Sequence, residues 1–201
     1  MAVLAGRNAD IYIASVSGTS MTGEATTSLG SGVYQITDAA KRAINPNATL
    51  TVLDGVATVP ASRYQVAFGT GKIDFGDYTP AGTITVTGEY LTLAQAAQGF
   101  EWTLDVQPML EETQTFGDAW KERTCVMREA TCSFQRFYED EYFFTNGTRY
   151  FVIACYLNVS GADRYVFGAM LSSQGTTSGV NETVKQNVQF SAHGVVDYAA
   201  S

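Results

Sequence analysis

Apolar and polar side chains alternate strictly between residues 100 and 107. The apolar set, which we expect to belong to the core, is Phe100, Trp102, Leu104 and Val106. The polar set is Glu101, Thr103, Asp105 and Gln107. Because successive side chains of a strand point to opposite faces, the pattern predicts a half-buried strand with one apolar face and one acidic, solvated face. Pro108 is expected to end this strand, because proline cannot donate a ladder hydrogen bond.

Similar alternation and regular turn signals predict a mainly β fold of about ten strands. The other predicted strands span 10–14, 33–36, 49–53, 63–68, 72–75, 83–91, 131–138, 150–159, 165–171 and 184–192. The dipeptide Asp54-Gly55 is a hairpin signal. Phe134 and Phe190 fall on the apolar faces of their strands and are predicted to belong to the core. Short helical turns are expected at 110–113 and 118–123 and a short helix at 138–144. No linker-like stretch divides the chain, which predicts a single domain over 1–201.

Residues 15–32 are dominated by Ser, Thr and Gly. Such a segment buries little apolar area to offset its ordering entropy, which predicts a long loop that becomes ordered against a partner. The side chains expected to make these inter-subunit contacts are Ser17, Thr22, Glu24, Thr27 and Ser31. A second polar loop is predicted at 172–181, and residues 1–8 are expected to form an N-terminal arm.

The composition suits one globular core that needs no metal or disulfide. The chain has 201 residues, of which 45% are hydrophobic and 16% are charged, and this amount of apolar material is sufficient for a core. The low share of charged residues has two interpretations. Either part of the surface is committed to other subunits, or a β protein uses Thr, Ser and Gly where a helical one uses Glu and Lys.

The charge excludes a protein that grips nucleic acid. The formal net charge is −8 and the chain has only 12 Lys and Arg residues, with no run among them. Gripping phosphates requires clustered cations. The acidity is compatible with a different relation to DNA, namely a wall that repels it.

The cysteines and the hydropathy indicate where the chain folds. Cys125, Cys132 and Cys155 are odd in number and not closely spaced, so they predict buried free thiols and not a disulfide framework or a zinc site. No apolar segment approaches the roughly 20 residues that span a bilayer. The N-terminus lacks the pattern of a signal peptide. We expect folding in a reducing cytoplasm and no membrane association.

Candidate catalytic groups are few. The single histidine, His193, has no second metal ligand in obvious register and no nucleophile motif. Residues 69–72 resemble a fragment of a phosphate loop, but a strand follows and not a helix. Paired carboxylates and aromatic residues that could serve a glycosidase or a sugar platform occur at Glu111-Glu112, 139–141, Trp120, Tyr138 and Tyr142. Neighbouring acids are usually a solvated face, so we expect no enzyme, no cofactor and no metal.

An ordered series of segments resembles the tail tube (major tail) proteins of long-tailed bacteriophages. The segments are Leu-Ala-Gly-Arg-Asn-Ala-Asp-Ile-Tyr-Ile at 4–13, Val-Tyr-Gln-Ile-Thr-Asp at 33–38, the meander pieces at 53–55, 64–66, 71–75 and 86–90, Thr-Gln-Thr-Phe-Gly-Asp-Ala-Trp-Lys-Glu-Arg-Thr at 113–124, Arg-Tyr-Val-Phe-Gly-Ala-Met-Leu-Ser-Ser at 164–173, and Val-Gln-Phe-Ser-Ala-His-Gly at 188–194. The resemblance covers most of the chain, but residues 15–32 match no part of it.

The resemblance implies a β-sandwich or partial barrel with a short flanking helix. It also implies that six copies close a ring and that rings stack into a tube in the virion, after synthesis in the host cytoplasm. The implied partners are other copies, the tape-measure protein, and tail terminator and distal tail proteins. Double-stranded DNA would pass through the channel without specific binding. Glu101 and Asp105 are then candidates to face the lumen. The alternatives are a carbohydrate-binding β-sandwich module, another virion or baseplate component, and a glycoside-acting enzyme.

Overall fold

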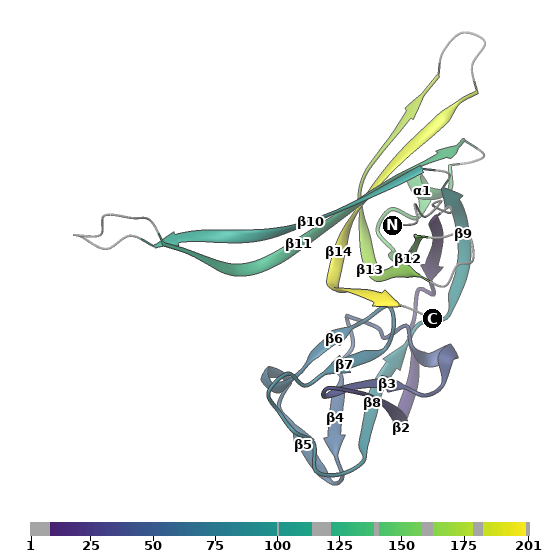
Figure 1. Ribbon diagram of the computed structural model, residues 1–201. Coiled ribbons are helices and arrows are strands. Elements are labelled where there is room, and N and C mark those ends of the chain that lie inside the picture. The colour runs from purple at the N-terminus through teal and green to yellow at the C-terminus, as the bar shows by residue number, and fades with distance from the viewer. Residues whose placement is uncertain are drawn as a thin grey trace.

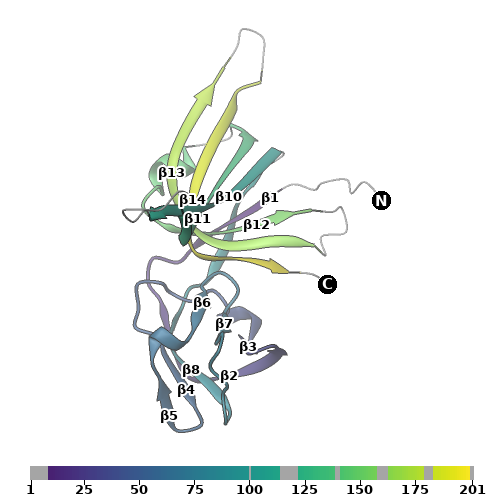
Figure 2. The ribbon, with the colours of Figure 1, turned by 60° about the vertical axis from the view of Figure 1, so that its left-hand side comes forward.

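A computed structural model describes residues 9–99, 101–113, 122–138, 141–157, 163–178 and 183–199. Two seven-stranded antiparallel sheets account for most of this part of the chain, and Figures 1 and 2 show them as an upper and a lower body. The fold class is mainly β, as the alternation predicts. None of the helices described has the length and apolar character needed to cross a membrane.

The large sheet has the strand order β10-β11-β14-β13-β12-β1-β9. Its strands are β1 (Ala9–Ala14), β9 (Leu93–Gly99), β10 (Glu101–Thr113), β11 (Glu122–Phe137), β12 (Tyr150–Tyr156), β13 (Arg164–Thr177) and β14 (Lys185–Ala199). A single helical turn, α1 (Tyr142–Thr145), precedes β12. The two edges of this sheet are therefore β10 and β9.

The second sheet is inserted between β1 and β9, and we call residues 16–91 the inserted lobe. Its order is β5-β4-β8-β2-β3-β7-β6. The strands are β2 (Thr19–Gly30), β3 (Val33–Ile36), β4 (Thr51–Asp54), β5 (Ala57–Val59), β6 (Gln65–Ala67), β7 (Lys72–Asp74) and β8 (Ile84–Tyr90), with 3-10 turns η1 (Ala39–Lys41) and η2 (Ala61–Arg63). The chain enters and leaves the lobe at one point, where the Ser15 amide donates to the Thr92 carbonyl at 2.9 Å.

Each sheet has its own core. In the large sheet, phenylalanines gather on the inner face: Phe134 and Phe190 stack with ring centroids 5.6 Å apart, and Phe143 of α1 packs edge-on against Phe134 at 5.8 Å. All three are buried. The core of the inserted lobe is built around Phe75 and a set of buried aliphatic residues, including Ile36, Ile44, Val52, Ile73, Ile84 and Val86. The prediction of one domain over 1–201 stays a prediction, and residues 1–8 lie outside the described residues.

Two buried thiols meet in the core of the large sheet. Cys132 of β11 and Cys155 of β12 are free, and their Sγ atoms lie 3.8 Å apart although β11 and β12 are not neighbouring strands. The curl of the sheet therefore brings them together, which sequence spacing did not predict. The hydrogen bond with Cys132 and burial both raise the pKa of the Cys155 thiol. Protonated, buried thiols of this kind act as small apolar groups.

The predicted loop at 15–32 is wrong, because β2 occupies residues 19–30. This strand pairs with β8 on one side and with β3 on the other. Met21 is buried beneath it, and bulges near Gly23 and Gly30, both at positive φ, adjust its register. The segment buries little apolar area of its own, but two neighbouring strands satisfy its backbone hydrogen bonds.

Three further predictions about local structure are wrong. β10 continues through Pro108, which pairs with Arg128; an edge strand tolerates proline because its outer side needs no ladder hydrogen bond. Residues 110–113 and 122–123 are strand and not helical turns, while 114–121 lie outside the described residues. β13 extends to Thr177, into the predicted 172–181 loop. The described residues form fourteen strands where we predicted about ten, because β2, β5 and β9 were not predicted.

Gly168 provides a test of the packing of the large sheet. A methyl group at this position of β13 would overlap the hydroxyl of the buried Tyr150. We expect Gly168→Ala to lower the free energy of unfolding by about 1–3 kcal/mol through overpacking, measured by urea denaturation. Gly175→Ala on the same strand is the matched control, because nothing lies within 4 Å of the added carbon. Equal stability of the two variants would contradict this account.

Candidate channel-lining face

The solvated side of β10 continues across three more strands of the large sheet. Directly opposed residues share a face, and the registers place the polar side chains in rows. One row is Glu101, Gln135, Asn187 and Gly175, the next is Thr103, Ser133, Gln189 and Ser173, and the third begins with Asp105, Thr131 and Ser191. We call these residues, with Gln107 and Glu129, the polar face.

The polar face carries hydroxyl, amide and carboxylate groups. Its three carboxylates are those of Glu101, Asp105 and Glu129, and both Glu101 and Asp105 are exposed. The Gln107 amide donates to Asp105 Oδ2 at 2.6 Å, and the Ser173 hydroxyl donates to Gln189 Oε1 at 3.1 Å. Such a surface can hold water and repel anions. It offers no cluster of cations to bind phosphates.

The opposite side of β10 is buried only near its start. Trp102 and Leu104 pack against the core of the large sheet, whereas Val106 is 49% exposed and does not belong to the core. Val106 pairs with Ala130, and β11 pairs with β14 only from Thr131 onward. Among the residues that the structure describes, no third strand therefore extends the sheet beside Val106 and Ala130. Phe100 lies outside the described residues.

Beyond this point β10 and β11 form a two-stranded arm. The arm comprises residues 107–113 and 122–130, and Figure 1 shows it projecting away from both sheets. Neither strand has a second neighbour here among the described residues. Its base is partly apolar, since Val106, Met109 and Val195 border a groove of about 1010 Å³. A two-stranded ribbon is marginally stable alone in water, so we expect the arm to be stabilised by contact with another chain.

Sequence reasoning missed the arm, although one signal was present. Residues 122–137 contain neither glycine nor proline, which is typical of one long element. The mixed polarity of residues 109–130 led instead to predicted helical turns. The period-two pattern identifies strands with one buried and one wet face, and residues 109–130 do not show it.

The predicted inter-subunit residues lie on or beside β2 and not in a loop. Glu24 pairs with Lys41 at 2.6 Å, and the hydroxyls of Thr27 and Thr37 lie 2.9 Å apart. Thr22 is exposed on the same strand, as are Ser17 before β2 and Ser31 after it. Two of the five are therefore engaged within the lobe. Contact with another copy stays a prediction for all five.

The candidate catalytic groups are dispersed. His193 is exposed and packs against Phe68 with ring centroids 5.6 Å apart. Lys72 begins β7 and pairs with an aspartate, so residues 69–72 form a turn and a strand. Glu111-Glu112 lies in the arm, and residues 139–140 and Trp120 lie outside the described residues. No group of three His, Cys, Asp or Glu residues that could hold a metal occurs in the described part of the chain.

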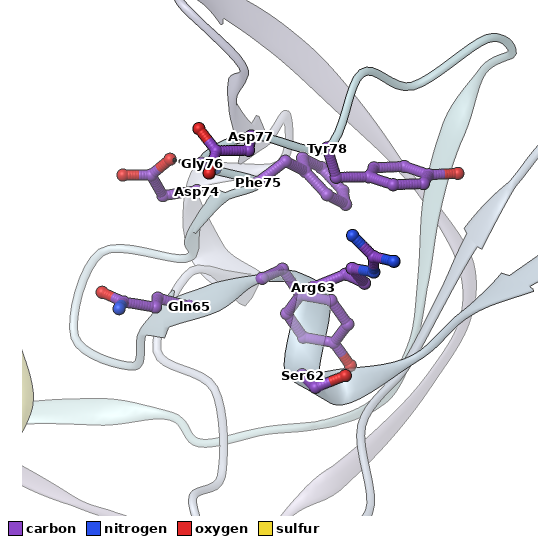
Figure 3. Close-up of a pocket in the computed structure, with 9 residues that line it drawn as sticks. Ser62, Arg63, Gln65, Asp74, Phe75, Gly76, Asp77 and Tyr78 are labelled. Carbon is purple, nitrogen blue, oxygen red and sulfur yellow. Dashed lines mark hydrogen bonds between the residues drawn. The ribbon is translucent and has the colours of Figure 1, made fainter.

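One small pocket of the inserted lobe combines aromatic and charged side chains. It has a volume of about 290 Å³ and lies beside η2 and β7. Figure 3 shows Arg63 extending toward Phe75 and Tyr78, with the carboxyl groups of Asp74 and Asp77 at one end. The Tyr78 hydroxyl donates to Asp54 Oδ2 at 2.9 Å. Hydrogen bonds from the Ala81 amide, which has the larger effect, and from Tyr78 lower the pKa of Asp54.

Solved structures similar to this chain include two of gene transfer agent particles. The virion of the native particle matches with a TM-score of 0.41 and 12% identity, over 54% of this chain and 89% of that chain. The tail of an empty particle, computed with helical refinement and C6 symmetry, matches with a TM-score of 0.42 and 12% identity, over 54% and 87%. No protein-family model and no curated protein matches the chain.

Proposed function

We propose that this chain is a structural virion protein of the tail-tube type. Six copies close a ring, rings stack into a tube, and double-stranded DNA passes through the channel. The observation that carries the proposal is the polar face of the large sheet, continued by an arm that has no second neighbour among the described residues. The resemblance of the sequence segments supports the same role. Tape-measure, terminator and distal tail proteins are the further partners that this role requires.

The polar face suits a channel because the residues that define it include no lysine or arginine to bind phosphate. DNA carries one charge per about 1.7 Å of its axis, and a cationic wall binds it by releasing counterions. The carboxylates of Glu101, Asp105 and Glu129 do the opposite. Their repulsion acts over a Debye length of about 8 Å at physiological ionic strength. DNA that is repelled from all sides stays centred and mobile.

Ring closure also satisfies the free edges of the large sheet. β10 and β9 stand at its two ends, and unpaired strand edges invite uncontrolled pairing with other chains. A head-to-tail contact that closes into a ring uses up such edges and leaves stacking as the direction of growth. The arm, which extends the β10 edge, is the element that we expect to reach a neighbour.

Electron microscopy of the purified protein in negative stain tests the proposal. We expect rings or tubes roughly 10 nm wide, the breadth of six such domains around a DNA-wide channel at ~10 Å sheet packing. Sedimentation should show a concentration-dependent large species. A protein that stays monomeric at every concentration and ionic strength tested would argue against the tube.

The aromatic pocket of Figure 3 favours a second candidate function, carbohydrate binding. Its buried Phe75 and half-buried Tyr64 and Tyr78 form an apolar wall, and Arg63 and Asp77 supply exposed polar groups. This combination suits a small polar ligand. A persistent monomer that binds monosaccharides through Tyr78 would support this function over the tube.

A further inference from the structure

A groove between the inserted lobe and the large sheet collects positive charge. It has a volume of about 660 Å³, and its lining includes Arg42, Lys72 and Arg164 but only one carboxylate, that of Asp197. These are three of the 12 basic residues in a chain whose net charge is −8. We call this site the basic groove. A local excess of cations in an acidic protein requires an explanation.

Only part of this charge is neutralised within the subunit. Lys72 Nζ lies 2.9 Å from both carboxylate oxygens of Asp197, which joins the lobe to β14. Arg42 donates from Nε to the Ile36 carbonyl at 3.0 Å and from Nη2 to the Thr37 carbonyl at 3.4 Å. A guanidinium has five N–H donors, so Arg42 keeps donors for a ligand.

Two buried hydrogen-bond donors of the groove have no acceptor among the described residues. They are Nε of Arg164 and the hydroxyl of Thr70, a side chain that is only 9% exposed. A third buried polar atom without a hydrogen bond, Oδ2 of Asp197, is an acceptor that is already ion-paired with Lys72. The Arg164 guanidinium lies 5.8 Å above the Tyr156 ring, which holds it in place. A buried donor without an acceptor costs stability. An oxyanion in the groove can accept from such a donor, and a carboxylate matches the guanidinium geometry.

The arm carries the complementary chemistry. The sequence places Glu111 and Glu112 consecutively in the last residues of β10, at the distal end of the arm. Glu112 stands opposite Arg123 of β11, whereas Glu111 stands opposite the uncharged Thr124. Because successive residues of a strand belong to opposite faces, Glu111 is the residue of this pair whose face carries no opposing cation at that position. Figure 1 shows the arm extending away from its own subunit, so this end does not lie against its own basic groove. We propose that the basic groove receives the Glu111-Glu112 segment of a neighbouring copy. This inference rests on the proposed self-assembly and names one contact that holds neighbouring copies together.

Charge reversal on each side of the contact gives a test with an internal folding control. Glu111→Lys/Glu112→Lys reverses the arm, and Arg42→Glu/Arg164→Glu reverses the groove. Each variant alone should assemble only at a concentration at least about tenfold higher than the original chain, since like charges then face each other. An equimolar mixture should assemble, because each reversed group meets a complementary one in the other chain. Electron microscopy and sedimentation measure both.

Rescue in the mixture shows that both variants are folded and that the contact lies between copies. Asp74→Lys/Asp77→Lys is the matched control for the arm variant, because it raises the net charge by the same four units at carboxylates outside the groove, and it should assemble normally. Normal assembly of either reversed variant overturns the contact, as does a mixture that fails to assemble. Either result leaves the tube proposal intact, which fails only when the original chain forms no rings or tubes.

Discussion

Shortening the arm is expected to abolish tube assembly and to leave the subunit folded. Gln107 and Glu129 are directly paired, so an Asn-Gly turn in place of residues 108–128 closes the hairpin with the two-residue geometry that strands favour. The arm lacks a second neighbouring strand in the described part of the chain, whereas the core residues of β11, such as Phe134, remain. Rings and tubes should disappear in electron microscopy at every concentration that supports them in the original chain.

The stability of the shortened chain separates an assembly defect from misfolding. Its free energy of unfolding in urea should stay within about 1 kcal/mol of the original, as for changes outside the core. Tubes of normal appearance would contradict an intersubunit role for the arm. Loss of the cooperative transition would instead show that the arm belongs to the folding unit.

Placing lysines on the polar face is expected to convert a repelling channel into a binding one. Glu101→Lys/Asp105→Lys changes the charge of each subunit by four units at two exposed positions. Tubes should still form, because neither side chain is buried. Because clustered cations bind DNA by releasing counterions, the variant tubes should retain duplex DNA at low salt and lose it steeply as salt rises.

The neutral variant Glu101→Gln/Asp105→Asn is the control for this experiment. It removes the repulsion without adding cations, so it should leave DNA unbound. In a complete particle, the lysine variant should also slow DNA delivery. Delivery at an unchanged rate by correctly assembled lysine tubes would reject the assignment of Glu101 and Asp105 to the lumen.

Periodicity predicted strands well where one face is buried and the other is wet. β1, β3, β8 and the start of β10 fall where the alternation places them, because side chains in such strands contact different environments on alternate positions. The hairpin at Asp54-Gly55 is also present, with Gly55 at a φ of 61°. In these places the local sequence determines both the strand and its faces.

Tertiary pairing decided the places where prediction failed. β2 is polar on most of its length, and only its position between β8 and β3 makes it a strand. Val106 continues a regular apolar series, but it lies beyond the point, at Thr131, where the pairing of β11 with β14 stops. Alternation can show which face of a strand is apolar. It cannot show how far the neighbouring strands extend to cover that face.

The basic groove could not be predicted from the sequence for a related reason. Arg42, Lys72 and Arg164 are far apart in the chain and belong to no charged run. The first two come from the inserted lobe, and the third comes from β13. Only the placement of the lobe against the large sheet brings them together. Net charge and composition average over this arrangement and therefore conceal it.

Because the inserted lobe is flanked by the adjacent residues Ser15 and Thr92, we expect that another domain can replace it. The chain leaves and rejoins the large sheet at adjacent hydrogen-bonded residues, so any compact fold with neighbouring termini can occupy the same place without altering the order of β1 and β9. Such an exchange gives up the Lys72–Asp197 ion pair that joins the lobe to β14, together with Arg42 and Lys72 of the basic groove. We therefore expect a chain with an exchanged lobe to keep the strand order of the large sheet and to lose the proposed contact between the basic groove and a neighbouring arm.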